Sequence, residues 1–356
     1  MNIEQAIKRL KTYPLNSQET ESVMEQIMTG QIETPLIVSF LIALNEQGID
    51  SEELAGAARV MRKHMEKIDP KNHTIILDTC GTGGDRKHTF NISTAAALVA
   101  AGVGIAVAKH GNRSITSQCG SADLLKELGV NTEMSPEVAQ KCLDEIDITF
   151  LFAPIYHPAM KFVMEARKQI AEEKREKTIF NFLGPLCNPA RANYQLIGVP
   201  DSGYAQSMAN ALTKLNDPEC AHALIVSGED HMDEITTRVA AKTLVYEVRD
   251  GKVVDPKGSR VDFAADFKKI PPGGVKGGSP KENAKIMQAI LRDKEKNAYR
   301  DIVVLNAAAA IYVADKTRGK TLEKGISEGI KLANKSIDDG KAWDKLKRLQ
   351  EYSHNG

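Results

Sequence analysis

Apolar residues recur at helical spacing through the first seventy residues of the chain. Ile3, Ile7 and Leu10 fall on one face of a helix, and the same period returns in three further segments. Thr34-Pro35 starts the third helical segment, and Gly48 stops it. The pattern predicts four short helices without strands, over residues 3–10, 19–28, 34–47 and 51–65, with a linker at 69–72.

Beyond this helical stretch, short apolar runs alternate with helical periods. Runs of strand length lie at 75–77, 104–108, 148–152, 195–199 and 223–226. Two more runs, at 243–248 and 252–254, flank Asp250-Gly251 and predict a hairpin, so part of the sheet is antiparallel. We therefore expect an α/β protein. A small all-helical domain would span 1–70, joined by helices from about 160–190. A large domain over 71–356 would hold a central mixed, mostly parallel sheet flanked by helices.

Composition and charge narrow the class of protein. The 47 basic and 47 acidic residues cancel, which argues against a protein that coats nucleic acid. Five cysteines without a C-x-x-C pair fit neither a zinc site nor a disulfide framework, and they favour a reducing cytoplasm. No apolar stretch approaches membrane-spanning length, and the first residues lack a signal-peptide core. We expect a cytoplasmic protein without nucleic-acid or membrane partners.

A glycine-rich stretch follows the first predicted strand. Gly81, Gly83 and Gly84 let the backbone turn sharply and approach a ligand, because they carry no Cβ. Residues 91–94 then start a helix, whose unpaired N–H groups and positive dipole end attract anions. The combination favours a phosphate site. A plain turn remains the alternative, because the stretch has the spacing of neither a P-loop nor a dinucleotide-binding loop.

A second unit of the same kind begins with the strand at 104–108. It leads into a polar loop with two cations, Lys109 and Arg113, and Gly120 then opens a helix with Ser121 as the expected N-cap. Two such units suit a ligand with more than one phosphate. Farther along, Asp233-Glu234 follows a strand, and paired carboxylates suit Mg²⁺, although a surface turn can have the same sequence.

Four ordered motifs carry a resemblance to a known family. DTCGTGGD at 78–85, TFNIST at 89–94, VAKHGNRSITS at 107–117 and GSADLLKELG at 120–129 resemble the anthranilate phosphoribosyltransferases. The resemblance continues at 157–160 and 178–189 and so covers most of the chain. It implies a step of tryptophan synthesis. The phosphoribosyl group of phosphoribosyl pyrophosphate (PRPP) would pass to the amine of anthranilate, giving N-(5-phosphoribosyl)anthranilate and pyrophosphate.

The resemblance also implies the site residues. Mg²⁺ would bind Ser93, Asp233 and Glu234. PRPP would be bound by residues of both glycine-rich units, and the 71–356 domain would be catalytic. These PRPP residues are Gly81, Gly83, Gly84, Asp85, Thr89, Asn91, Ile92, Ser93, Thr94, Lys109, His110, Gly111, Asn112, Arg113, Ser114, Ser117 and Ser121.

Anthranilate would meet Gly81, Asn112 and Arg167. The planar guanidinium of an arginine can hold both oxygens of a carboxylate, although Arg167 could also be an ordinary surface residue. Lys109 and Arg167 would be the catalytic residues, acting mainly by positioning and charge. The chain departs from the family after Arg167, where residues 170–178 lack the usual glycine and bring Lys177 before the threonine. We expect a longer helix there, since Glu, Lys and Arg favour helix.

Two rival functions share this architecture. One is a pyrimidine nucleoside phosphorylase, and the other is a non-catalytic nucleic-acid-binding relative. The Asp233-Glu234 pair, the intact GTGGD motif and the neutral charge favour the transferase. The apolar helical layer at the N-terminus could pair with a copy of itself, so we expect a homodimer.

Overall fold

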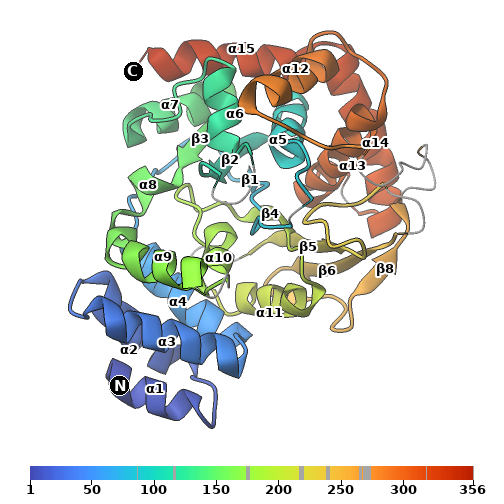
Figure 1. Cartoon of the computed structure of the whole chain (residues 1–356). Helices are drawn as coiled ribbons and strands as arrows, with labels where there is room; N and C mark the ends of the chain where they lie inside the picture. The colour runs from blue at the N-terminus through green and yellow to red at the C-terminus, as the bar shows by residue number, and fades with distance from the viewer. Residues whose placement is uncertain are drawn as a thin grey trace.

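A central sheet lies between two groups of helices, with the chain termini at opposite ends of the molecule (Figure 1). The structure is a computed structural model. It describes residues 1–85, 87–114, 118–173, 177–215, 220–237, 241–263, 267, 274–317 and 319–355. Ser117, one of the expected PRPP residues, lies outside the described residues.

The N-terminal region forms the four predicted helices. Three of them begin with a capping box, in which the side chain of Asn2, Asn16 or Asp50 accepts the N–H three residues on. The backbone N–H of the same cap residue donates to the side chain of that third residue. These reciprocal bonds satisfy backbone donors at the helix starts. The helices are α1 (Ile3–Leu10), α2 (Ser17–Met28), α3 (Thr34–Gln47) and α4 (Ser51–Lys63).

The sheet is mixed, as predicted. Its order is β3-β2-β1-β4-β5-β6-β7, with β8 also on β6. The first five strands in this order pair in parallel, and β6 to β8 pair antiparallel. The strands are β1 (Ile76–Asp78), β2 (Ala106–Gly111), β3 (Ile148–Phe152), β4 (Tyr194–Gly198), β5 (His222–Gly228), β6 (Thr243–Arg249), β7 (Lys252–Val253) and β8 (Ser259–Val261).

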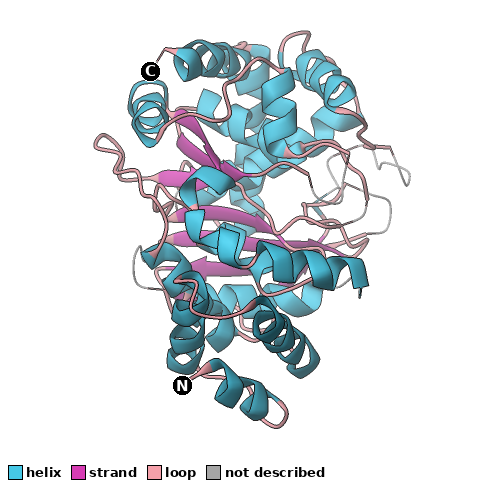
Figure 2. Cartoon of the chain, turned by 60° about the vertical axis from the view of Figure 1, so that its left-hand side comes forward, coloured by secondary structure: helices cyan, strands magenta, loops and turns pink. Residues whose placement is uncertain are grey.

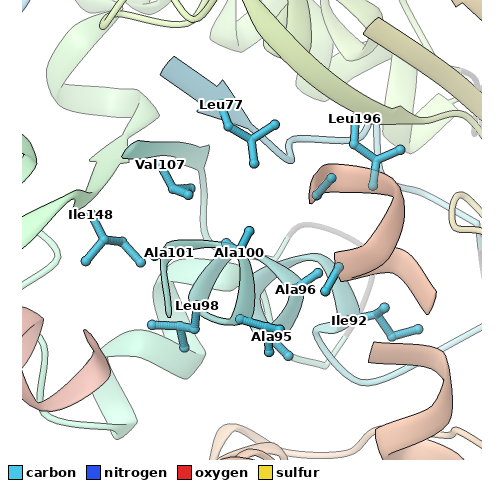
Figure 3. Packing of buried hydrophobic residues seen from close by; sticks show 14 of the residues in the cluster. Leu77, Ile92, Ala95, Ala96, Leu98, Ala100, Ala101, Val107, Ile148 and Leu196 are labelled. Carbon is cyan, nitrogen blue, oxygen red and sulfur yellow. The ribbon is translucent and has the colours of Figure 1, made fainter. Parts of the chain in front are cut away.

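One face of the sheet is covered by α5 (Ile92–Gly102) and the C-terminal helices. Small side chains from Ala95 to Ala101 are buried along α5, so Leu77, Val107 and Leu196 of the sheet lie close against it (Figure 3). The remaining helices that contribute to this core are α6 (Ser121–Glu127), α7 (Pro136–Ile146), α12 (Pro280–Leu291), α13 (Ala298–Val313), α14 (Leu322–Asp338) and α15 (Lys341–His354).

The opposite face shares a second core with the N-terminal helices (Figure 2). Ile197 of β4 and Ile225 of β5 belong to the same buried cluster as Phe40 of α3 and Leu54 of α4. Three further helices contribute, α9 (Met164–Glu173), α10 (Phe180–Leu183) and α11 (Ser202–Leu212). Short turns α8 (Ala153–Tyr156), η1 (Pro158–Phe162) and η2 (Gly184–Leu186) complete the connections. The division into domains at residue 70 stays a prediction.

Two local expectations were wrong. Lys109 and His110 lie inside β2, because pairing with β3 continues through Gly111, and not in the loop that follows. Ser121 is the first residue of α6 and its N-cap is Gly120. The Asp123 carboxylate makes the capping bonds, accepting the N–H groups of Gly120 at 2.9 Å and Ser114 at 3.0 Å. The expected lengthening of the helix after Arg167 falls partly on residues 174–176, which lie outside the described residues.

Candidate active site

The candidate site lies where several parallel strands end. The glycine loop follows β1, residue 198 ends β4, and the acidic pair follows β5. Because parallel strands point the same way, the segments after them meet at one edge of the sheet, where α/β proteins commonly bind ligands. Lys109, near the end of β2, reaches the same edge.

The glycine loop has the backbone conformation that its sequence predicts. Gly83 and Gly84 have φ of 68° and 78°, in the left-handed region that favours glycine. Gly81 lies so close to β4 that a Cβ would be 2.9 Å from the carbonyl oxygen of Gly198. Thr82 donates its N–H to that same carbonyl at 2.9 Å. The loop is therefore attached to the end of β4.

Lys109 is buried beneath this loop, with 4% of its surface exposed. Its Nζ donates to Thr79 O and to Ser93 Oγ, both at 3.4 Å. Ser93 lies in the first turn of α5, so the ammonium group and a helix N-terminus face one place. Burial raises the pKa of Asp78 to about 6, and the charge of Lys109 opposes that rise.

For the acidic pair, the effect of burial outweighs the positive charge that the described residues place near it. Burial, and then the charge of Asp85, raise the pKa of Asp233 to about 7. Burial, and then the charge of Asp233, raise the pKa of Glu234, whereas Lys109 and the N–H of Ser93 oppose the rise. Asp85 Oδ2 is buried with no hydrogen-bond partner in the described part of the chain. Crowded carboxylates of this kind favour a bound cation.

The donor set suits Mg²⁺ that is also bound by substrate. Within the described residues, no three His, Cys, Asp or Glu side chains form a complete metal site. Mg²⁺ characteristically takes only one or two protein carboxylates and completes its octahedron with phosphate oxygens and water. Asp233, Glu234 and the Ser93 hydroxyl fit that pattern.

Gly198 holds the acidic loop against the end of β4. A Cβ at this position would overlap the carbonyl oxygen of Asp233, a backbone atom that cannot rotate away. We expect Gly198→Ala to lower the free energy of unfolding by about 3 kcal/mol and to weaken activity, because the loop must shift. Urea denaturation measures the stability change. Gly184→Ala is the control, since a Cβ there meets nothing within 4 Å. Equal stability of the two variants would contradict the prediction.

The second glycine-rich unit is only partly directed at the site. Asn112 and Arg113 are exposed. The Arg113 guanidinium pairs with Glu133 at 2.6 Å and lies over the Phe152 ring at 5.4 Å. In this conformation, the contacts of the Arg113 side chain are with Glu133 and Phe152, not with Lys109. Its role in PRPP binding stays a prediction.

The loop before α5 is held by residues that no local sequence pattern indicates. Asn91 accepts from Asn283 Nδ2 at 3.0 Å and donates to Cys119 O at 3.1 Å. Thr89 pairs with Lys276 in an isolated bridge. Asn283 is nearly two hundred residues away on α12, and nothing in its local sequence indicates this contact.

Arg167 has no anionic partner among the residues that the structure describes. Its guanidinium lies over the Phe180 ring at 5.8 Å, and burial lowers its pKa. No described carboxylate lies within ion-pair distance of it. A desolvated arginine of this kind favours a bound carboxylate.

A buried imidazole pair also went unrecognised in the sequence. His110 Nδ1 donates to Gly184 O at 3.1 Å, and its Nε2 is buried without a hydrogen-bond partner in the described residues. The His157 ring centroid is 5.1 Å away. Burial lowers the pKa of His110 to about 4 and that of His157 to about 3, so both are neutral at pH 7. The two histidines lie in separate motifs, and no local pattern indicates their contact.

Comparison with known proteins defines the class first. The helical bundle domain of the glycosyl transferase family matches residues 4–65, and the a/b domain of the same family matches residues 73–343. The chain thus belongs to the glycosyl transferase family.

More specific relatives cover almost the whole chain. The anthranilate phosphoribosyltransferase of Desulfosudis oleivorans is 44% identical over 339 residues, which is 95% of each chain. That of Symbiobacterium thermophilum is 43% identical over 96% of this chain and 94% of its own. The chain belongs to the anthranilate phosphoribosyltransferase family.

Solved structures of anthranilate phosphoribosyltransferases are also similar to this chain. The enzyme from Thermus thermophilus superposes with a TM-score of 0.87 at 36% identity, covering 98% of this chain and 99% of its own. The enzyme from Saccharomyces cerevisiae, solved with PRPP and Mg, also gives 0.87, at 27% identity and with 99% and 98% covered. In the part of the chain that the structure describes, none of the helices is long and apolar enough to cross a bilayer.

Proposed function

We propose that the chain transfers the phosphoribosyl group of PRPP to the amine of anthranilate, giving N-(5-phosphoribosyl)anthranilate and pyrophosphate. The observation that carries this proposal is the cluster of Lys109, Ser93 and Glu234 at the N-terminus of α5. It combines a buried ammonium group, helix N–H groups and a desolvated carboxylate beside the glycine loop. These groups suit a magnesium-bound diphosphate.

Ser93, Asp233 and Glu234 would hold Mg²⁺. The bound ion would neutralise phosphate charge and so favour departure of pyrophosphate. Lys109 and the α5 N–H groups would stabilise the negative charge that develops on the leaving group as the ribose C1–O bond breaks. The carbon becomes cation-like, so leaving-group stabilisation matters more than a strong nucleophile.

Arg167 would bind the anthranilate carboxylate and so orient the amine toward ribose C1. The amine is neutral at pH 7, and its lone pair can attack without prior loss of a proton. Gly81 and Asn112 would complete the anthranilate site. The remaining residues of both glycine-rich units would bind PRPP.

We further propose a homodimer in a reducing cytoplasm. Half-buried apolar residues of α3, such as Leu36 and Ile42, support a contact between helical layers. All five cysteines are free thiols, which supports a reducing compartment. Light scattering of the purified chain tests the dimer, and a monomer mass at micromolar concentration would contradict it.

The reaction is tested by following anthranilate fluorescence with PRPP, with and without Mg²⁺. We expect loss of fluorescence that requires both. Thymidine or uridine cleavage by phosphate, without anthranilate consumption, would instead identify a pyrimidine nucleoside phosphorylase. Inactivity in both assays would leave the binding-protein alternative.

A further inference from the structure

Lys177 connects the helical layer to the glycine loop. It lies between α9 and α10, whose residues Ile170 and Phe180 are buried in the core shared with α1 to α4. Asn45, near the end of α3, donates from Nδ2 to the carbonyl oxygen of Lys177 at 2.6 Å. The backbone of Lys177 is therefore held from the helical side.

The side chain of Lys177 extends away from the helical layer and reaches the glycine loop. Nζ donates to the carbonyl oxygen of Gly83 at 3.2 Å. Its Cε and Nζ also occupy the space that a Cβ on Gly84 would need, at 2.9 Å. The lysine thus lies directly against the two left-handed glycines, and their conformation decides where the loop N–H groups point.

The ammonium group of Lys177 lies at Gly83 of the glycine loop, two residues before Asp85. Lys109 approaches the same loop from β2, where its Nζ donates to Thr79 O at 3.4 Å. The two lysines therefore bring positive charge to the loop from different elements.

On another side, Lys177 borders a cavity of about 350 Å³ whose lining includes Glu46 of α3, Asp201 and Tyr204. Acidic side chains therefore lie on that side of the residue, and its Nζ is bonded to the Gly83 carbonyl oxygen on the other.

We propose that Lys177 is a positioning residue for PRPP. It fixes the glycine loop from the helical layer and places a positive charge beside the diphosphate site. This inference rests on the proposed function, since it assigns the loop to PRPP. It predicts an effect on the phosphate substrate and none on anthranilate.

The test compares Lys177→Met, which removes the charge and retains a long stem, with Lys177→Arg, which retains the charge. We expect the methionine variant to raise the KM for PRPP about tenfold, as for loss of one charged hydrogen bond, and to leave the KM for anthranilate within about twofold. Calorimetric titration with inorganic pyrophosphate, with and without Mg²⁺, should show a similar weakening. The arginine variant should recover most of the affinity.

Lys214→Met is the matched control. Lys214 Nζ pairs with Glu52 of α4 at 2.6 Å, so it also joins the helical layer to the rest of the chain, but away from the glycine loop. We expect Lys214→Met to leave the KM for PRPP, the KM for anthranilate and the pyrophosphate affinity unchanged. Equal effects of the two methionine variants, or unchanged pyrophosphate affinity in Lys177→Met, would overturn the inference. If the unsubstituted chain shows no turnover, the proposed function fails, and the pyrophosphate titration alone decides the role of Lys177.

Discussion

Replacing Lys109 by methionine is expected to lower kcat/KM by about a thousandfold. Its ammonium group is the buried cation within 3.4 Å of the Ser93 hydroxyl, at the helix start where the diphosphate would lie. Removing one preorganised donor to a developing negative charge typically costs about a hundredfold to a thousandfold, and here a full charge is lost. The loss should fall mainly on kcat, measured by steady-state fluorescence.

The control for this variant is Lys345→Met. Lys345 is also largely buried, and its Nζ pairs with Asp147 at 2.7 Å, far along the chain from the glycine loop. We expect it to lose stability but not activity. The assigned role would be disproved if Lys109→Met kept its thermal midpoint and its activity stayed within about tenfold of that of the unsubstituted chain.

The double variant Asp233→Asn, Glu234→Gln is expected to lose the Mg²⁺ response. Both carboxylates are desolvated, and their neutral amides keep the shape but cannot supply negative charge to a bound Mg²⁺. We expect a fall in kcat/KM of about a thousandfold and a rise of at least about tenfold in the Mg²⁺ concentration needed for half-maximal activity.

Glu229→Gln is the matched control on the same segment. Glu229 pairs with Arg260 at 2.6 Å. Its substitution should leave the Mg²⁺ titration unchanged. A double variant with the same Mg²⁺ midpoint as the unsubstituted chain would place the metal elsewhere.

The sequence predicted those parts of the fold that depend on local pattern. Helical periods and start signals indicated the four N-terminal helices, and the turn at Asp250-Gly251 indicated the hairpin. The predicted end of β2 was wrong. Lys109 and His110 have the polar character of loop residues, but pairing with β3 extends the strand through them. Strand ends of this kind depend on a distant partner and not on local propensity.

The same distinction applies to the site. The glycine loop and the start of α5 could be predicted because they are contiguous. The contacts of Asn283 with Asn91, of His110 with His157 and of Lys177 with Gly83 join residues far apart in sequence. No pattern of neighbouring residues in the sequence indicates these contacts. The proximity of Asp85 to Asp233 likewise required the structure.

The core beneath the N-terminal helices has a consequence for biosynthesis of the chain. Phe40 and Leu54 belong to the same buried cluster as Ile170 and Ile225. These partners are translated more than a hundred residues later. While the ribosome makes the intervening segment, the apolar faces of α3 and α4 lack the part of their final cover that α9, α10 and α11 supply. The nascent chain therefore passes through a stage in which chaperones have an exposed apolar surface to bind.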